Sequence, residues 1–320
     1  MSKILKTLCI AVVGVLAAAS SQAQDAIRVA GPHPTALTTI TARVAQELGF
    51  FEKENLVVDM LWTQGGSDVL QAVISGSVDI GIETGLGGVL SAIEKGAPIE
   101  VISSQMTGAG EFYWYVKADS DIQSFADLQD GETVSFSRPG ASSETILNAL
   151  LAQSGAKATP VSSGSPPETL TQVMSGQIDV GWGAPPAYPE IKDGRLRIIG
   201  RGNDATVLAG QTTRVNVANA AYLEANKDTV RRFLRAMNAT LDALYTDPEV
   251  LAKAAEFVKL DVADARSVLT DFVPREAFTM NKLGDLEGSM QQAVENKQLS
   301  APLSAEAQEK INKNIADLAP

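Results

Sequence analysis

The sequence predicts an α/β fold made of two similar lobes with a cleft between them. The segment LQAVISGSVDIG at residues 70–81 is matched, 100 residues later, by LTQVMSGQIDVG at residues 170–181. Each segment has the pattern of a helix end, a glycine stop and a short apolar strand. The roughly 297 residues that follow an N-terminal targeting segment are also too many for one typical core. A helix-to-strand hinge used twice therefore indicates two lobes, and clefts between lobes hold small molecules.

The first part of the chain alternates short strands and helices, an order typical of a mostly parallel sheet. β-branched and apolar clusters predict strands at residues 27–30, 56–62, 78–82 and 100–103. Apolar residues at helical spacing predict a helix over residues 35–48 that ends at Gly49, a helix leading to Gly76, and another from the glycines near residue 85 to about Lys95. The stretch GPHP at residues 31–34 is expected to be a loop.

Residues 111–116 alternate between two faces, and we interpret them as a connecting strand between the lobes. A short helix at residues 124–128 then precedes a second α/β series. Its strands are expected at residues 133–137, 158–161, within the second repeat segment and at 196–199, with a helix over 142–153. Ser165 and Glu168 form a capping-box pattern, with Pro166 between them, that starts the second repeat helix.

The remaining chain is expected to return to the first lobe and finish in helices. The β-branched stretch at residues 213–217 predicts the return strand, and helical patterns follow at residues 226–245, 248–258, 263–272, 286–294 and from 304 onward. The predicted organisation is a signal peptide at residues 1–23, the first part of lobe I at 24–112, lobe II at 113–208, and the return to lobe I with the C-terminal helices at 209–320.

The N-terminus has the composition of a cleavable secretory signal. Lys3 and Lys6 precede an apolar run over residues 8–19, and small residues around Ala23 suit a signal peptidase. The run is too short to span about 30 Å of hydrocarbon. Cys9, the only cysteine, lies inside this segment and too early for a lipid anchor. The processed chain would then contain no thiol and no disulfide, and a periplasmic location is expected.

The acidity of the chain argues against nucleic acid or an anionic membrane as a partner. Without Lys3 and Lys6, 24 basic residues stand against 38 acidic ones, a net charge near −14. Both of those partners require clustered Lys and Arg side chains. The acidity can equally serve solubility alone, and it does not exclude an anionic small molecule held by local groups.

Several segments together resemble one family. These segments are AQELGFFEKENL at residues 45–56, Gly65-Gly66, SGSVDIG at 75–81, FADL at 125–128, and the loops at 137–143 and 179–186. Their order and spacing resemble the nitrate, sulfonate, taurine and thiamine-precursor class of ABC-transporter substrate-binding proteins, over nearly the whole processed chain. One departure is that the run WGAPP at residues 182–186 lacks the acidic residue that often precedes the proline in that class.

The resemblance implies a type II periplasmic-binding fold, in which two α/β lobes are joined by two crossing strands. It implies a protein that captures one small molecule in the cleft, closes like a Venus flytrap and delivers the ligand to an ABC permease. An organic anion such as a sulfonate or a carboxylate is the expected ligand, and a monomer is the expected state.

Ligands of such sheets bind beyond the carboxyl ends of strands, near helix N-termini. In lobe I this rule selects His33 and Thr35 after the first strand, Gly66 at a helix start, and Glu83, Thr84 and Gly85 after the third strand. An acid at the end of an apolar strand is costly unless it is paired or contacts a ligand. The alternatives are that His33 faces solvent and that Glu83 is a solvated carboxylate.

In lobe II the same rule selects Arg138, Ser142 and Ser143. Free backbone N–H groups and the helix dipole favour an anion there. Arg138 would add a bidentate contact to a carboxylate or sulfonate, and a zwitterion could bridge it to Glu83. Glu144 in the same turn could instead supply the negative charge, which would leave Arg138 on the surface.

Three aromatic residues near strand ends or crossings, Trp62, Trp114 and Trp182, are candidates to stack on a flat ligand, although packing is the usual role of tryptophan. Asp79 and Asp179 occupy equivalent positions in the two repeats. We interpret both as structural turn residues that accept backbone N–H groups.

No feature of the sequence points to catalysis, and the chain is expected not to be an enzyme. One histidine and no cysteine after processing leave no zinc motif, and the sequence has no dinucleotide, Walker or nucleophile-elbow motif. No cofactor and no metal are expected. Enzymes of the thiamine-precursor branch share the fold but need a histidine-rich site, which this chain lacks. A TRAP-type or sensor-associated binding protein remains an alternative.

Overall fold

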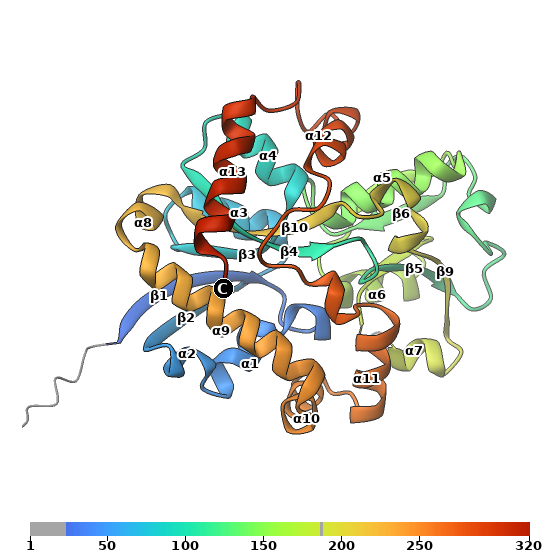
Figure 1. Ribbon diagram of the computed structural model, residues 1–320. Coiled ribbons are helices and arrows are strands. Elements are labelled where there is room, and N and C mark those ends of the chain that lie inside the picture. Colours follow the sequence, from blue (N-terminus) through green and yellow to red (C-terminus); the bar gives the residue numbers. More distant parts are fainter. Residues whose placement is uncertain (1–23, 186–187) are drawn as a thin grey trace, which may run out of the picture.

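The computed structural model describes residues 24–185 and 188–320 and contains two groups of strands, each covered by helices (Figure 1). The predicted signal peptide lies outside the described residues. Within the described residues, no helix is both long and apolar enough to cross a membrane.

The larger group, which we call lobe I, is built on a five-stranded sheet in the order β2-β1-β3-β10-β4. Its strands are β1 (Asp25–Pro32), β2 (Leu56–Thr63), β3 (Ile80–Gly85), β4 (Ile99–Thr107) and β10 (Thr212–Asn219). β1 is parallel to β2 and β3, whereas β10 lies antiparallel between β3 and β4. The sheet is therefore mixed, because the strand that returns from the other lobe is inserted between two strands of the first.

Both faces of this sheet are buried by helices. On one face, apolar residues that alternate along β1 and β3 pack against α1 (Thr41–Glu47), α2 (Phe50–Lys53), α9 (Lys227–Thr246), α10 (Pro248–Phe257) and α11 (Val262–Asp271). On the other face, Val215 and Val217 of β10 lie in a core formed with α3 (Gly66–Ile74), α4 (Leu86–Glu94), α12 (Leu286–Glu295) and α13 (Ala305–Leu318). In Figure 1 the C-terminal end of α13 lies beside α9, where Arg231 Nε donates to the carbonyl of Asp317 at 2.9 Å.

The helix predicted over residues 35–48 is broken into a 3-10 turn, η1 (Leu37–Thr39), and α1. The Thr39 hydroxyl donates to the carbonyl of His33 at 2.7 Å, and this local bond competes with a continuous helix. Shorter elements complete lobe I: α8 (Ala220–Ala225) follows β10, and η5 (Arg275–Ala277) precedes α12.

The second group, lobe II, has an antiparallel sheet β8-β5-β9 and a parallel pair β6-β7, which a bridge between Val134 and Val180 connects. Its strands are β5 (Tyr113–Lys117), β6 (Thr133–Phe136), β7 (Thr159–Ser162), β8 (Gly181–Gly183) and β9 (Leu196–Arg201). Its helical elements are η2 (Phe125–Asp127), α5 (Ser142–Ser154), α6 (Pro166–Met174), α7 (Tyr188–Lys192), η3 (Gly202–Asp204) and η4 (Thr206–Leu208).

The segment interpreted as a connecting strand is instead the central strand of the lobe II sheet. β5 is buried on both sides, with Trp114 and Val116 in one core and Tyr113 and Tyr115 in another. Alternation along β5 therefore separates two buried faces rather than a buried face from an exposed one.

The chain crosses between the lobes twice, after β4 and before β10. The two crossings are joined to each other, because Gly108 N–H donates to the carbonyl of Gln211 at 2.8 Å. Gly202 N–H donates to the carbonyl of Phe112 at 2.8 Å on the lobe II side. This arrangement agrees with the predicted fold of two α/β lobes and two crossings. The exact lobe boundaries stay a prediction.

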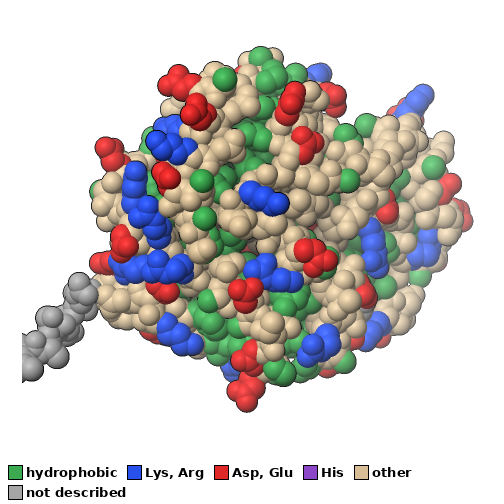
Figure 2. Space-filling view, in the orientation of Figure 1, with side chains coloured by type: hydrophobic (Ala, Val, Ile, Leu, Met, Phe, Trp, Pro, Cys, Tyr) green, Lys and Arg blue, Asp and Glu red, His purple; other side chains and the backbone are tan. Residues whose placement is uncertain are grey.

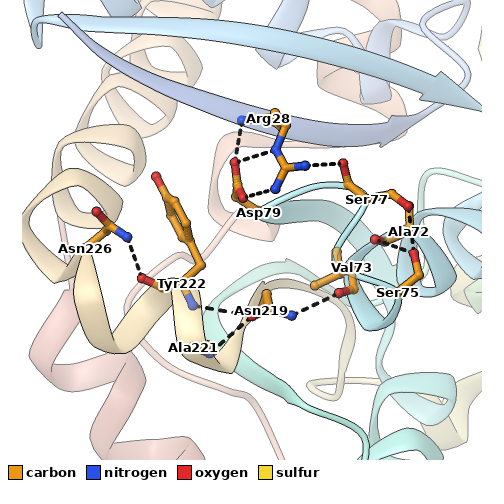
Figure 3. Close-up of polar contacts among 10 residues, drawn as sticks. All are labelled: Arg28, Ala72, Val73, Ser75, Ser77, Asp79, Asn219, Ala221, Tyr222 and Asn226. Atoms are coloured by element: carbon orange, nitrogen blue, oxygen red, sulfur yellow. Dashed lines mark hydrogen bonds and ion pairs between the residues drawn. The ribbon is translucent and has the colours of Figure 1, made fainter.

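The two copies of the repeat have the same structural role. Asp79 accepts the backbone N–H of Arg28 at 2.8 Å and pairs with its guanidinium, as Figure 3 shows. Asp179 accepts the backbone N–H of Thr133 at 2.8 Å in lobe II. Gly76 and Gly176 have φ values of 72° and 75°, which glycine adopts without steric cost. The interpretation of both aspartates as turn residues is confirmed.

Figure 2 shows basic and acidic side chains next to one another on the face seen in Figure 1. Ion pairs among the described residues include Arg235 with Glu54 at 2.7 Å and Arg275 with Asp242 at 2.8 Å. On this face the basic side chains are thus interspersed with acidic ones.

Candidate functional site

A small cavity lies between the lobes, at the carboxyl ends of β1, β3 and β8. Its lobe I side includes Pro32, His33, Thr39, Gly65, Gly66, Glu83, Gly85 and Arg214, and its other side includes Phe112, Ser137, Ala141, Ser142, Ser143 and Trp182. Its volume is about 20 Å³, which is room for a single water molecule. The lobes are therefore closed on each other, and a larger ligand requires them to separate.

Three helices begin at this cavity. α3 starts at Gly66, α4 follows Gly85, and α5 starts at Ser142, and residues at each of these starts line the cavity. None of the three has a side chain that hydrogen-bonds to its first N–H groups as an N-cap. The N-termini of three helices, with the positive ends of their dipoles, consequently converge on one small volume, an arrangement that favours an anion.

Glycine at position 85 allows the lobes to approach this closely. A Cβ atom there would lie 2.7 Å from the backbone nitrogen of Ser142 and 2.8 Å from the carbonyl oxygen of Gly140. Both contacts are with backbone atoms that cannot rotate away. A side chain at residue 85 would therefore hold the lobes apart.

Direct interlobe contacts surround the cavity. The Ser67 hydroxyl donates to the carbonyl of Pro139 at 2.6 Å, and Leu37 N–H donates to the carbonyl of Pro185 at 3.1 Å. Arg138 pairs with Asp68 across the cleft at 3.5 Å, with both side chains about two-fifths exposed. Arg138 thus contacts the opposite lobe at the cleft edge, and it is not among the residues that line the cavity.

Glu83 stands at the end of β3 in a strained backbone conformation. Its φ is +59°, which is uncommon for a residue with a side chain. The Asn216 side chain accepts the N–H of Glu83 at 2.9 Å and holds this conformation, and the Glu83 residue is 2 % exposed. Strain of this kind is often found at binding sites, where the surrounding structure imposes it.

Arg214 joins Glu83 to a second buried carboxylate. Its Nη1 donates to Glu83 Oε2 at 2.8 Å, and its Nη2 pairs with Glu111, in the segment that crosses to lobe II. The side chains of all three residues are almost fully buried. Two carboxylates share one guanidinium, so the cluster has an excess negative charge when both are ionised.

Burial raises the pKa of Glu83 to about 7, although the guanidinium of Arg214 opposes the shift. Burial also lowers the pKa of Arg214 from its ordinary value. Desolvation lowers the pKa of His33 to about 4, so this imidazole is neutral at pH 7. The cavity therefore holds a neutral histidine and a carboxyl group that titrates near neutrality.

Several buried polar atoms at the cavity have no hydrogen-bond partner among the described residues. They are His33 Nδ1, Glu83 Oε1, Trp182 Nε1 and Arg214 Nε. Buried polar groups are normally satisfied, and each unsatisfied one calls for an explanation. Donors on Trp182 and Arg214 and an acceptor on Glu83 give the cavity unused capacity for a polar ligand.

Seven of the predicted site residues line the cavity together: His33, Gly66, Glu83, Gly85, Ser142, Ser143 and Trp182. The other five lie elsewhere. Trp114 is in the core of lobe II, where its Nε1 donates to the carbonyl of Ser135 at 2.9 Å. Thr84 is buried, and its hydroxyl donates to the carbonyl of Val215 at 2.9 Å. Trp62 packs beside Gly31, Thr35 faces a second cavity, and Arg138 lies at the cleft edge.

Sequence reasoning missed Arg214, Thr39 and Phe112. Arg214 had a detectable signal, because it is the one charged residue in the mostly β-branched segment TTRVNV. Phe112 packs edge-on against Trp182, with ring centroids 5.5 Å apart. No group of three or more His, Cys, Asp or Glu residues that could hold a metal ion exists in the described part of the chain.

Two α/β lobes, two crossings and an enclosed polar cleft define the class of periplasmic-binding folds. Solved structures of this class match over most of the chain. The alkanesulfonate-binding protein SsuA of Xanthomonas axonopodis superposes with a TM-score of 0.73 at 20% identity, covering 88% of this chain and 97% of that one. The nitrate-binding protein NrtA of Synechocystis superposes with a TM-score of 0.65 at 14% identity, covering 90% and 85%. At these identities the matches show the fold.

The family is shown by a sequence model. The NMT1/THI5-like family model matches residues 38–250, and the chain belongs to that family. This agrees with the resemblance drawn from the sequence.

Curated relatives correct one expectation. The yeast (Saccharomyces cerevisiae) protein THI13, named a 4-amino-5-hydroxymethyl-2-methylpyrimidine phosphate synthase, is 25% identical over 219 residues, which cover 64% of this chain and 63% of the yeast protein. The yeast synthase THI5 matches to the same extent. The chain thus spans less than two thirds of these relatives. Because they are named as enzymes, the expectation that this chain is not an enzyme is wrong. That expectation depended on the single histidine and on the absence of zinc, dinucleotide, Walker and nucleophile-elbow motifs.

Proposed function

We propose that this protein captures a small organic anion between its lobes and that it acts as the periplasmic solute-binding component of an ABC uptake system. The observation that carries the proposal is the convergence of the uncapped N-termini of α3, α4 and α5 on one interlobe cavity. Structural neighbours that bind sulfonate and nitrate support the same class of ligand.

The proposed mechanism of capture is closure of the two lobes around the ligand. Backbone N–H groups come from both lobes, so an anion at this point contacts both only when the lobes are together. A ligand shifts the equilibrium toward the closed state to the extent that it binds that state better. Arg214 lines the cavity, and it pairs with Glu111 in the segment that crosses to lobe II. This pair connects the proposed ligand site to the crossings between the lobes.

A ligand screen on the secreted, processed protein tests the proposal. Thermal unfolding is measured with sulfonates, carboxylates, nitrate and phosphorylated pyrimidines. A ligand at 100 times its dissociation constant should stabilise the protein by about 2.7 kcal/mol. Absence of stabilisation by every anion would contradict the proposal.

A matched pair of variants locates the site. Ser142→Asp places a carboxylate at the start of α5 in the cavity wall and should abolish anion binding. Asn148→Asp adds the same charge to the same helix away from the cavity and should leave binding intact. Equal effects of the two variants would show that the anion binds elsewhere.

A second candidate is favoured by the names of the yeast relatives. A 4-amino-5-hydroxymethyl-2-methylpyrimidine phosphate combines an anionic phosphate with an amino group on a flat ring. The phosphate suits the helix N-termini, and the amino group could donate to the unused Oε1 of Glu83. Mass spectrometry of material that copurifies with the protein would distinguish this ligand from a sulfonate or a carboxylate.

A further inference from the structure

Glu83 has one carboxylate oxygen that no group among the described residues uses. Its Oε2 accepts a hydrogen bond from Arg214 Nη1 at 2.8 Å, whereas its Oε1 is buried without a hydrogen-bond partner. The side chain is fully buried, and the residue lines the cavity between the lobes. Oε1 is therefore the atom of Glu83 that remains available to a ligand.

An ionised Oε1 is poorly matched to an anion. An ionised carboxylate oxygen only accepts hydrogen bonds, and it therefore offers no donor to an anion. Two negative groups would also repel each other strongly in a closed cavity of about 20 Å³, where almost no solvent screens them. A proton on Oε1 removes both difficulties, because the neutral carboxyl group donates an O–H to the anion.

The charges that face Glu83 do not neutralise it fully. Arg214, from β10, also pairs with Glu111 in the crossing segment, so one positive charge is shared by two carboxylates. His33, from the loop after β1, is neutral at pH 7, because desolvation lowers its pKa to about 4. The other charged side chains on elements around the cavity do not line it; they are Asp68, Arg138, Glu144 and Glu168.

Glu83 can hold the proton near neutral pH. Burial raises its pKa to about 7, although the guanidinium of Arg214 opposes the shift. A bound anion adds a further negative charge beside the carboxyl group, and a neighbouring like charge favours the neutral form. Anion binding and protonation of Glu83 therefore favour each other, and by linkage the effect is the same in both directions.

We infer that Glu83 contacts the ligand in its protonated form, so that each anion binds together with one proton held on Oε1. The proton comes from the solvent and forms the Oε1–H bond, while Oε2 continues to accept from Arg214. Capture is then favoured by acidic surroundings, and release of the anion releases the proton. This inference rests on the proposed function and adds a proton to what the site binds.

Titration calorimetry with methanesulfonate, nitrate and acetate tests the inference, because each probe keeps one negative charge between pH 6 and pH 8. Measurements in buffers of different ionisation enthalpy give the number of protons taken up. Uptake should be close to one proton per bound anion at pH 8. The dissociation constant should rise about tenfold or more from pH 6 to pH 8. Binding without proton uptake, or binding that tightens as the pH rises, would overturn the inference.

A pair of variants assigns the proton to Glu83. Glu83→Gln cannot ionise and can still donate an N–H. It should bind each probe equally well at pH 6 and pH 8, without proton uptake. Glu100→Gln is the matched control, because Glu100 is a carboxylate of the same sheet that pairs with Lys310 and does not line the cavity. It should keep the proton uptake of the unaltered protein. Proton uptake that persists in folded Glu83→Gln would overturn the inference.

The proposed function and the proton requirement can fail separately. If none of the three probes and no other anion of the ligand screen binds at either pH, the proposed anion site is wrong and this inference fails with it. If the probes bind with the same affinity at pH 6 and pH 8, the anion site stands and the proton requirement is wrong. These measurements on the unaltered protein decide the matter even if Glu83→Gln folds poorly.

Discussion

Arg214 Nη1 donates to Glu83 Oε2 at 2.8 Å, and both side chains are at most 3% exposed. Arg214 belongs to the strand that returns from lobe II, and Glu83 lies near the end of β3, whose last residue, Gly85, precedes α4. The same guanidinium pairs with Glu111 on the other crossing. One buried charge cluster therefore links the cavity between the lobes to both segments where the chain crosses from one lobe to the other.

Replacement of Arg214 should be severely destabilising. Arg214→Met keeps much of the side-chain volume but leaves Glu83 and Glu111 buried without a counter-ion. Breaking a buried ion pair by removal of one partner typically costs about 3–5 kcal/mol. The free energy of unfolding, measured by urea titration at pH 7.5, should fall by that amount. Arg28→Met, at a guanidinium that is 53% exposed, serves as the control and should cost at most about 1 kcal/mol.

Glu83 should make stability depend on pH in a defined direction. Its pKa rises from an ordinary value of 4.5 to about 7 in the folded protein, so the folded state binds more protons than the unfolded state between these values. The stabilisation is fully present below pH 4.5 and is lost as the pH rises through 7. Glu83→Gln mimics the protonated form and leaves Arg214 paired with Glu111.

The expected result is that Glu83→Gln matches the unaltered protein at pH 5 and is more stable at pH 8. One pKa unit corresponds to about 1.4 kcal/mol, so the gain at pH 8 should be roughly 1–3 kcal/mol. Denaturant titrations at the two pH values measure it. A variant that is less stable than the unaltered protein at pH 8 would show that the ionised carboxylate is favourable in the fold.

The sequence predicted the parts of the site that depend on local rules. Gly66, Gly85 and Ser142 follow strands or loops and begin helices, and such starts lie at the carboxyl edge of an α/β sheet. The repeat equally predicted the roles of Asp79 and Asp179, because each depends only on a turn and the neighbouring strand.

Other features depend on contacts between distant segments. Trp114 and Trp182 both lie in the core of lobe II, but of the two only Trp182 also lines the cavity. Arg214 lies on the strand that returns from lobe II. Its partners lie 131 and 103 residues away in the chain, which no local pattern encodes.

The equivalent aspartates of the repeat should have unequal effects on stability. Asp79 is 8% exposed and holds both the backbone and the guanidinium of Arg28, whereas Asp179 is exposed and holds the N–H and hydroxyl of Thr133. Asp79→Ala should cost about 1–3 kcal/mol, because a partly buried N–H and a guanidinium lose their acceptor. Asp179→Ala should cost less. Ligand affinity, measured on the folded variants, should be unchanged in both. A loss of affinity would show that these residues contribute to ligand binding.

Trp182 and Trp114 offer a comparison of a ligand contact with a core contact. Trp182 Nε1 is buried without a partner among the described residues and belongs to a side chain that lines the cavity. Trp182→Phe keeps an aromatic ring beside Phe112 but removes this donor. Trp182 is 1% exposed in the core of lobe II, so the smaller ring should lower the free energy of unfolding. Loss of the donor should lower ligand affinity about twofold to tenfold, the value of one hydrogen bond.

Trp114→Phe should lower stability without a change in ligand affinity. Its Nε1 bond to the carbonyl of Ser135 is inside lobe II, so its loss should lower the free energy of unfolding by about 1–3 kcal/mol and leave ligand affinity intact. Calorimetric titration and urea unfolding of both variants separate the two effects. If Trp182→Phe loses stability but keeps full affinity, the indole N–H of Trp182 does not contact the ligand, and the polar capacity of the cleft is carried by Arg214 and the helix N-termini alone.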